Sequence, residues 1–286
     1  MIVVTGATGN IGSEVVKQAA AVGARLRALV RDPKKATALK GRNVELFEGD
    51  LAKPDTLDAA FFGAEKVFLL SSLGPAQVQL QGNAVEAAKR ARVRHVVKLS
   101  TAGASGDSPV SFFRWHAQTE QQIERAGIAW TFLRPRYFMQ NLLAYAPSIV
   151  ESGTFFAPAR DARIAPVDVR DVAAVAVDVL TGTGFESMVC EISGPEVLSF
   201  ADMASKLSVA AGRKVTYRDI APVEARDGMR VAGAPDWLVD GILAIFARFV
   251  AAQTEAVSPA VEDLTGYPPR GFDEFARDHA ARFRGK

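Results

Sequence analysis

The sequence predicts an α/β protein built on a doubly wound parallel sheet, together with a second, smaller lobe. Short β-branched runs alternate with helical patterns from the first residues onward, which is typical of a parallel sheet with crossover helices. The first run ends in three glycines with the spacing G-x-x-G-x-x-G, and a helical pattern follows at once. The chain has 286 residues, of which 49% are hydrophobic, and this is enough to bury a large core.

The alternation places the expected elements in a regular order. We expect strands at residues 2–5, 25–30, 44–48, 66–70, 95–99 and 130–133. We expect helices near residues 12–22, 34–39, 54–62, 77–91 and 113–126. The helix near residues 77–91 carries its apolar residues on one face, and Pro54 followed by Asp55 is a favoured helix start.

Beyond residue 133 the pattern loosens, because four prolines interrupt residues 135–166. Asp168 is expected to cap a helix whose apolar residues recur at helical spacing. A strand at residues 188–192 and a helix at residues 199–211, capped by Ser199, are expected next. From about Tyr217 onward we expect helices and loops.

Composition and charge exclude several classes of protein. The net charge is +2 and the basic residues are scattered, so we expect neither a nucleic acid nor a membrane surface as a partner. The single cysteine, Cys190, excludes a disulfide within the chain and a cysteine-based zinc site, and the three histidines lack metal-ligand spacing. We therefore expect no metal site. The chain starts directly with a strand and has no apolar run of membrane-span length, so we expect a cytoplasmic protein.

The glycine-rich turn predicts a dinucleotide site of the Rossmann type. Gly6 can adopt a positive φ in the turn, Gly9 lets the backbone approach a phosphate, and Gly12 lets the helix pack closely on the strand. The strand before the turn and the helix after it are the context that such a motif requires, whereas a turn without a ligand is the alternative. The contacts to the cofactor in this turn are assigned to Gly6, Thr8, Gly9, Asn10, Ile11 and Gly12.

The residues after the second strand select between NAD and NADP. Arg31 follows the apolar run directly, with Lys34 and Lys35 one turn later, and these groups suit the dianionic 2′-phosphate of NADP. Asp32 would instead bind the ribose of NAD if the strand ran one residue further, and a charged turn at Asp32-Pro33 is compatible with either cofactor. The sequence favours NADPH, with NADH as the alternative, and assigns Arg31 and Lys35 to its binding.

Polar residues also follow the next three strands, at the carboxyl edge of the sheet where ligands of such folds bind. Asp50 and Leu51 are placed to meet the adenine ring. The other residues assigned to cofactor contact at this edge are Ser71, Ser72, Ser100 and Thr101. We expect residues 1–184 to form the cofactor domain, with segments near 137–165 contributing to the substrate pocket, and residues 185–286 to form the smaller substrate or lid lobe.

Four stretches of the chain resemble a known family: VVTGATGNIG at residues 3–12, LVRDP at 29–33, EGDL at 48–51 and LRPRYFMQN at 133–141. The chain is similar to the NmrA-like branch of the atypical short-chain dehydrogenases/reductases, in particular to type 2 NAD(P)H:quinone oxidoreductases and triphenylmethane reductases. The resemblance implies binding of NADPH or NADH without flavin, and direct hydride transfer from the nicotinamide to an electrophile. Some members of the family instead sense the NADP redox state and do no chemistry.

One catalytic pair of the wider family is absent, because no tyrosine of this chain is followed by a lysine four residues later. His116 resembles the histidine of the His-x-x-x-Glu stretch in the quinone and triphenylmethane reductases. Since an imidazole titrates near neutrality, His116 can donate a proton to a developing anion. Alternatively, it only hydrogen-bonds the cofactor or caps a buried polar group. Glu120 either orients His116 or is a solvated helix residue, and the solvated position is favoured.

Residues 134–141 follow the sixth strand, where the cofactor region gives way to the substrate region. Arg134 and Pro135 are assigned to the cofactor, and Tyr137 is the second candidate catalytic residue. Aromatic side chains suit planar ligands, although aromatic residues at this spacing are also typical of ordinary core. The residues assigned to the substrate are Phe113, Tyr137, Phe138 and Asn141.

The sequence thus predicts an NADPH-dependent reductase that transfers hydride to a small conjugated electrophile such as a quinone, dye, imine or enone. The alternative is a non-enzymatic, NADP(H)-binding redox sensor that regulates a partner protein, which the missing catalytic pair favours. A sugar-nucleotide epimerase is disfavoured, because its chemistry requires the tyrosine base. Either a monomer or a homodimer is compatible with helices that flank a doubly wound sheet.

Overall fold

The computed structural model describes residues 1–284, which form two compact units. The first unit comprises Met1–Pro135, Val169–Ile192 and Asp263–Gly266. The second comprises Arg136–Asp168, Ser193–Glu262 and the residues from Tyr267 onward. The predicted division at residue 185 assigns the strand at residues 188–192 to the smaller lobe, whereas this strand belongs to the sheet of the first unit.

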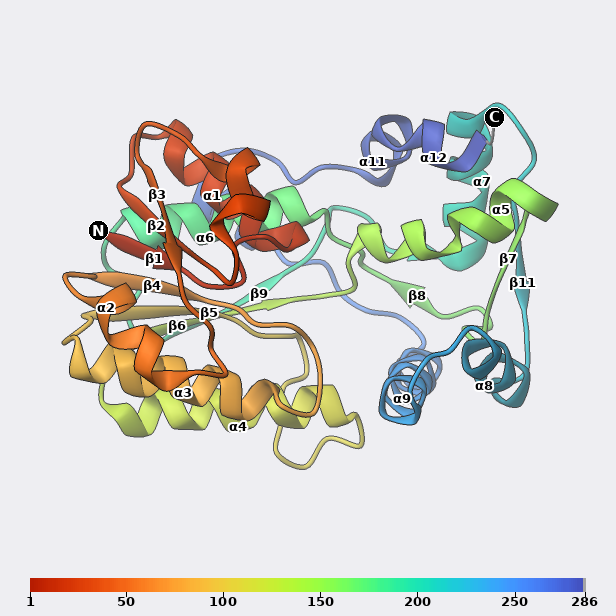
Figure 1. The fold of residues 1–286 in the computed structure, drawn as a ribbon. Helices are drawn as coiled ribbons and strands as arrows, with labels where there is room; N and C mark the ends of the chain where they lie inside the picture. The colour runs from red at the N-terminus through yellow and green to blue at the C-terminus, as the bar shows by residue number, and fades with distance from the viewer. Residues whose placement is uncertain (285–286) are drawn as a thin grey trace. The chain divides into compact units, whose positions relative to one another are not determined.

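The core of the first unit is a seven-stranded parallel sheet with the order β3-β2-β1-β4-β5-β6-β9 (Figure 1). Its strands are β1 (Ile2–Val4), β2 (Leu26–Val30), β3 (Val44–Glu48), β4 (Lys66–Leu69), β5 (His95–Leu99), β6 (Ala129–Pro135) and β9 (Met188–Ile192). The strand order reverses between β1 and β4. Loops leaving the two halves of such a sheet diverge at this point, and ligands bind there.

Helices cover both faces of this sheet, as its apolar strands require. Two helices, α1 (Asn10–Ala21) and α6 (Val169–Thr181), pack beside each other on one face (Figure 1). The other face carries α3 (Gln77–Arg90) and α4 (Ser111–Ala126). The short segment η1 (Pro33–Leu39) connects β2 to β3, and η2 (Pro54–Thr56) with α2 (Leu57–Phe61) connects β3 to β4.

The predicted strands and helices of the first unit are confirmed, and their ends differ by only a few residues. Residues 33–39 form a 3-10 helix rather than an α-helix. The Asp32 carboxylate accepts a hydrogen bond of 2.9 Å from the Lys34 N–H, and Pro33 occupies the first turn. Asp32 therefore closes this turn, as one of the two interpretations of the charged segment requires.

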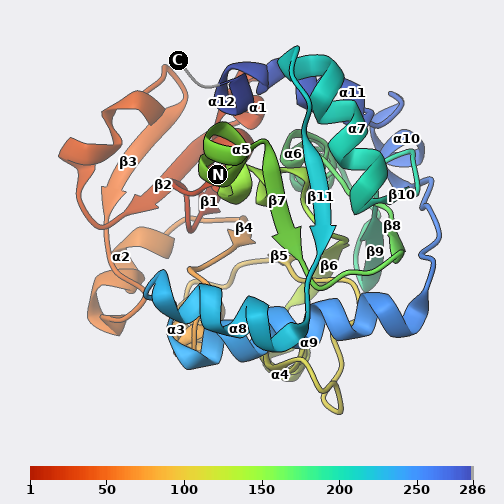
Figure 2. The ribbon, with the colours of Figure 1, turned by 90° about the vertical axis from the view of Figure 1, so that its right-hand side faces the viewer.

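The second unit contains two small sheets (Figure 2). In one, β7 (Thr154–Ala157) pairs in parallel with β11 (Thr216–Asp219); in the other, β8 (Arg163–Ile164) pairs antiparallel with β10 (Leu198–Ser199). The expectation of only helices and loops beyond Tyr217 is wrong at β11. This strand is mostly exposed and polar, so it lacks the apolar alternation that would reveal it.

Helices surround these sheets and enclose an aromatic core. They are η3 (Met139–Tyr145), α5 (Ala146–Ser152), α7 (Phe200–Ala211), α8 (Pro222–Val231), α9 (Asp236–Ala252), α11 (Phe272–Asp278) and α12 (Ala280–Arg284). The short helix α10 (Ala260–Thr265) contains residues of both units. The predicted cap of α7 is confirmed, since the Ser199 hydroxyl and the Asp202 carboxylate each accept a backbone N–H at 3.0 Å. The core of this unit is rich in phenylalanine, with Phe155, Phe200, Phe272, Phe275 and Phe283 buried.

Candidate functional site

The turn between β1 and α1 has the geometry that the glycine pattern predicts. Gly6 adopts φ +61°, and a Cβ there would lie 2.9 Å from the Leu70 carbonyl oxygen, so only glycine is accommodated. Gly9 is the N-terminal cap of α1, and no side chain caps this helix end. The first-turn N–H groups of a helix have no partner within the helix, so this end is suited to bind an anionic phosphate.

Arg31 stands at the carboxyl end of β2, where the sequence places it. Its side chain is exposed and forms no hydrogen bond or ion pair with the residues that the structure describes. Asp32 is engaged in the turn, and the Lys35 ammonium lies 3.9 Å from its carboxylate. The Arg31 guanidinium is therefore available to bind a ligand at this strand end, whereas the Asp32 carboxylate is already hydrogen-bonded within the turn.

The ends of β3 and β4 carry polar groups that already have partners. The Asp50 carboxylate accepts the Ala52 N–H at 3.0 Å, and the Leu51 carbonyl accepts the Asn83 side-chain amide at 2.7 Å. The Ser71 hydroxyl accepts the Gln81 side-chain amide at 3.0 Å. These bonds hold the loops after the two strands in place at the carboxyl edge of the sheet.

A buried polar cluster joins β5, β6 and α4. Glu120 accepts the Ser100 hydroxyl at 2.5 Å and binds Arg134 through two hydrogen bonds of 3.0 and 2.5 Å. The Glu120 side chain is 6% exposed. The expectation that Glu120 is solvated is therefore wrong, because Arg134 from the neighbouring strand provides the partner that a buried carboxylate needs. Ser100 and Arg134 remain predicted cofactor contacts, but both hold Glu120 here.

His116 lies one turn before Glu120 on α4 and contacts a residue that the sequence analysis did not select. Its Nδ1 is 2.8 Å from the Nζ of Lys98, whose side chain projects from the middle of β5 and is fully buried. The sequence alone could have indicated Lys98, because this lysine interrupts the apolar run of an expected buried strand, where lysine is rare.

Both members of this pair have shifted pKa values. Burial lowers the pKa of Lys98 to about 7, although the attraction of Glu120 partly opposes the shift and Arg134 adds to it. Burial and the nearby Lys98 hold the pKa of His116 well below its usual range. The expectation that His116 titrates near neutrality is therefore wrong, and the imidazole is neutral at pH 7.

The predicted substrate residues after β6 lie in the second unit. Tyr137 packs edge-on against Phe200 and Phe249, and burial raises the pKa of its phenol well above the usual range. Asn141 is exposed and hydrogen-bonds Tyr137. Phe113 is buried within α4 of the first unit. A phenol with a raised pKa is a weaker acid, so Tyr137 is better suited to hydrogen bonding than to proton donation.

Comparison with known proteins identifies the family. Residues 1–265 match the NmrA-like family. The chain belongs to this family. The NAD(P)H azoreductase of Xenophilus azovorans is 44% identical over 283 residues, which cover 99% of each chain. The match confirms the family that the four sequence stretches indicate.

Solved structures of related proteins share the fold of this NmrA-like protein. The NADPH-dependent quinone oxidoreductase of Escherichia coli, complexed with NADPH, superimposes with a TM-score of 0.89 at 30% identity and covers 97% of this chain and 99% of its own. The triphenylmethane reductase of Citrobacter sp., complexed with NADP(H), gives a TM-score of 0.86 at 26% identity over 98% of this chain and 100% of its own. The predicted Rossmann-type sheet is confirmed.

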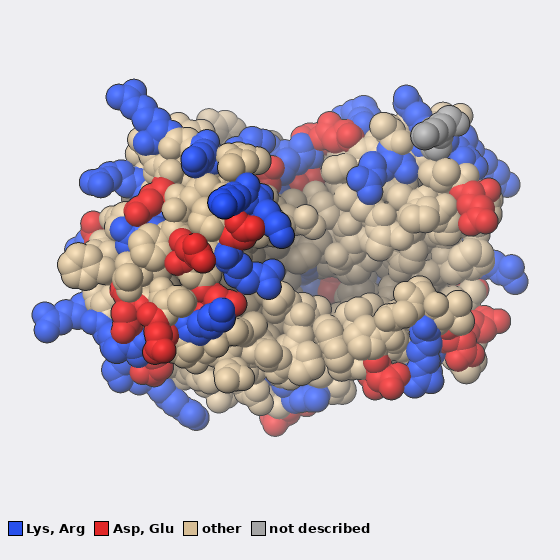
Figure 3. All heavy atoms as spheres, viewed as in Figure 1, with Lys and Arg blue, Asp and Glu red and all other residues tan. Residues whose placement is uncertain are grey.

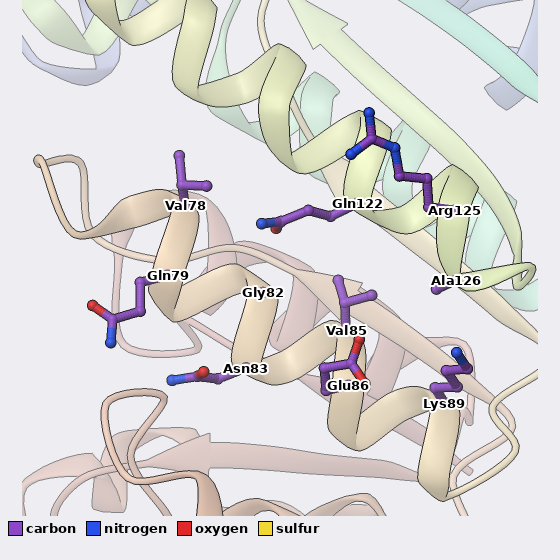
Figure 4. A pocket seen from close by; sticks show the side chains of 10 residues that line it. All are labelled: Val78, Gln79, Gly82, Asn83, Val85, Glu86, Lys89, Gln122, Arg125 and Ala126. Atoms are coloured by element: carbon purple, nitrogen blue, oxygen red, sulfur yellow. The ribbon is translucent and has the colours of Figure 1, made fainter.

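Other features of this NmrA-like protein lie outside the candidate site. A groove of about 400 Å³ runs between α3 and α4, where Gly82 faces Gln122 (Figure 4), and no predicted site residue lines it.

Lys and Arg are interspersed with Asp and Glu over the face in Figure 3, in keeping with the small net charge. Among residues 1–284, no helix is long and apolar enough to cross a membrane, and no acidic, histidine or cysteine cluster could hold a metal ion.

Proposed function

We propose that this protein is an NADPH-dependent reductase that delivers hydride directly to a small conjugated electrophile, such as a quinone, a dye, an imine or an enone. It is an NAD(P)H-dependent oxidoreductase of the NmrA-like family. The observation that supports this class of acceptor is the similarity, over nearly the whole chain, to an azoreductase and to a quinone oxidoreductase. The names of these two relatives point to azo compounds and quinones, which are both conjugated electrophiles. We therefore propose the class of conjugated electrophiles rather than one particular substrate.

The residues at the carboxyl edge suit NADPH. The uncapped N-terminus of α1 would bind the pyrophosphate, and Arg31 with Lys35 would bind the 2′-phosphate. Asp50 and Leu51 would border the adenine ring. When bound, NADPH supplies the hydride, whereas the protein orients the acceptor, excludes water and balances the charge that develops on it.

His116 is the group that we assign to the acceptor. Its Nδ1 is engaged by Lys98, whereas its Nε2 has no partner among the described residues and is not enclosed. An N–H at this position would donate a hydrogen bond to the oxygen or nitrogen that becomes negative after hydride transfer. In the second unit, Tyr137, Phe138 and Asn141 remain the proposed substrate residues, which would act by aromatic packing and by hydrogen bonding.

The test is to follow the oxidation of NADPH and of NADH by the purified protein with a panel of quinones, azo dyes, triphenylmethane dyes, enones and imines. Turnover with one acceptor class, and a strong decrease in kcat for His116→Gln, would support the proposal. His279→Gln is the matched control, because His279 lies between α11 and α12 of the second unit. Tight NADP(H) binding without turnover of any acceptor would overturn it in favour of a redox sensor.

A further inference from the structure

The Lys98 side chain occupies an unusual position for a lysine. It extends from the centre of a parallel sheet, it is fully buried, and its sheet neighbours Leu69 and Phe132 are apolar. Its Nζ has two partners, the Leu99 carbonyl oxygen at 3.0 Å and the His116 Nδ1 at 2.8 Å. A buried ammonium normally requires a carboxylate partner, and Lys98 forms no ion pair with any carboxylate among residues 1–284.

The charged groups around Lys98 explain why it has no ion pair. Glu120 on α4 is the carboxylate that attracts it, but both Glu120 oxygens bind Arg134 of β6, and one also accepts the Ser100 hydroxyl. Arg134 repels the ammonium. Lys98 can therefore lose its proton near neutral pH, where its pKa lies at about 7, whereas Arg134 keeps its charge.

The contact with Lys98 also determines the form of His116. While Lys98 is an ammonium it can only donate, so Nδ1 is then the acceptor and the proton of the neutral imidazole is on Nε2. Nε2 is the ring nitrogen that has no partner among the described residues and is not enclosed. Lys98, Nδ1 and Nε2 thus form a continuous path from a buried proton to an open donor position.

We propose that Lys98 is a positioning residue that holds His116 as an Nε2–H donor and passes a proton to it during the reduction. This inference rests on the proposed function. A two-electron reduction of a quinone, imine or azo bond requires one hydride, which NADPH supplies, and one proton. His116 releases the Nε2 proton to the anionic oxygen or nitrogen of the acceptor as Nδ1 takes a proton from the Lys98 ammonium.

The proton balance closes in this scheme. One N–H bond breaks at Nε2 and one O–H or N–H bond forms on the acceptor, while one N–H bond breaks at Nζ and one forms at Nδ1. The imidazole remains neutral, and Lys98 becomes a neutral amine. After the product leaves, a solvent proton reaches Nε2 and the Nδ1 proton returns to Nζ. One hydride, which carries two electrons, and one separate proton are therefore transferred in each turnover.

The first experiment needs no cofactor and no acceptor. Histidine labelled with ¹⁵N in the imidazole reports the tautomer and the pKa of each of the three histidines, and His116→Gln assigns one signal set. We expect wild-type His116 to be neutral at pH 7, with Nδ1 unprotonated while Lys98 is charged. In Lys98→Met the pKa of His116 should rise, because the neighbouring charge is removed, although burial of the imidazole still holds it below the usual range. An unchanged titration of His116 in this variant would overturn the proposal.

Lys66 supplies a matched control for this substitution. It also extends from a central strand, its Nζ binds the Val179 and Gly182 carbonyl oxygens, and it lowers the pKa of His95. Lys66→Met should therefore shift the titration of His95 and leave that of His116 unchanged. A shift of His116 in both variants would indicate a general change of the fold and would overturn the assignment to Lys98.

The second experiment separates proton transfer from electrostatic positioning. Lys98→Arg keeps a charge and hydrogen-bond donors, but the guanidinium does not lose its proton. We expect kcat of the wild type to fall above pH 7, and both Lys98→Met and Lys98→Arg to lower kcat by about 100-fold without this fall, while KM is retained. Wild-type kcat in Lys98→Arg would overturn the proton-transfer step. If the wild type reduces no acceptor, the proposed function fails, and the NMR titration alone decides the coupling of Lys98 to His116.

Discussion

A Cβ atom on Gly12 would lie 2.2 Å from the carbonyl oxygen of Gly6. The two glycines thus fix how closely α1 approaches the turn after β1, and this contact belongs to the folded protein itself. Gly9, between them, has extended backbone angles, and a Cβ there would meet the Gly6 oxygen at 3.4 Å, which is an ordinary contact. The three glycines of one motif therefore have different physical roles.

Gly12→Ala and Gly9→Ala should separate folding from cofactor binding. Gly12→Ala forces backbone apart, so we expect the free energy of unfolding to fall by roughly 3 kcal/mol. Gly9→Ala should change it by less than about 0.5 kcal/mol, yet weaken NADPH binding, because the new methyl group occupies the phosphate approach. Denaturant unfolding and calorimetric NADPH titration measure the two effects. Equal loss of stability in both variants would contradict this division.

Arg31→Ala should reduce the preference for NADPH over NADH. A charge-assisted hydrogen bond contributes about 1.5–3 kcal/mol, so we expect the NADPH affinity to fall by about 10- to 100-fold while the NADH affinity changes little. Arg25→Ala is the control, because Arg25 is an exposed arginine at the opposite end of the same strand. Should Arg31→Ala leave the ratio of the two dissociation constants unchanged, the 2′-phosphate would have to bind elsewhere.

The sequence predicted the parts of the fold that depend on local pattern. The strands and helices of the first unit have strong periodicity, and the glycine turn has its own flanking elements. The β11 strand depends on pairing with β7, more than fifty residues earlier, and carries no apolar alternation.

The polar interior of the candidate site was less predictable. His116 could be selected from a motif, whereas its state could not, because that state depends on Lys98 eighteen residues earlier. The partner of Glu120 comes from another element, and its identity requires knowing how α4 lies on the sheet. Local sequence specifies which residues are present at the edge of the sheet, but tertiary packing specifies their protonation.

The stability of the protein should depend on pH through Lys98. Its pKa falls from 10.5 to about 7 on folding, so between these values the unfolded chain holds a proton that the folded chain has lost. The free energy of unfolding should therefore rise with pH in this window, by up to about 1.4 kcal/mol per pH unit. Below pH 7 the lysine is charged in both states and this contribution is constant and unfavourable.

Urea unfolding at about pH 7, 8 and 9 measures this slope. Lys98→Met should be more stable than the wild type at pH 7 and should show a smaller slope, because no buried ammonium has to form. Lys89→Met, at an exposed position of α3, should keep the wild-type slope. Parallel curves for the wild type and Lys98→Met would show that the ammonium is not desolvated on folding.

Breaking the Glu120–Arg134 pair should cost more than breaking a surface pair. In Glu120→Gln the guanidinium, 23% exposed, loses the carboxylate that balances its charge, so we expect a loss of roughly 3 kcal/mol in unfolding free energy. Asp58→Asn removes one partner of the Arg90–Asp58 pair, in which both side chains are at least half exposed, and should cost less than about 1 kcal/mol.

The double variant Glu120→Gln with Arg134→Met decides between two explanations of that cost. If it arises because an unbalanced charge is left in the interior, removing the charge should restore most of the lost stability. If it arises from the hydrogen bond that Ser100 donates to Glu120, the second substitution should restore nothing, and Ser100→Ala alone should reproduce the loss. We expect the first result, because two of the three hydrogen bonds of Glu120 go to Arg134 and the ion pair determines where the carboxylate lies.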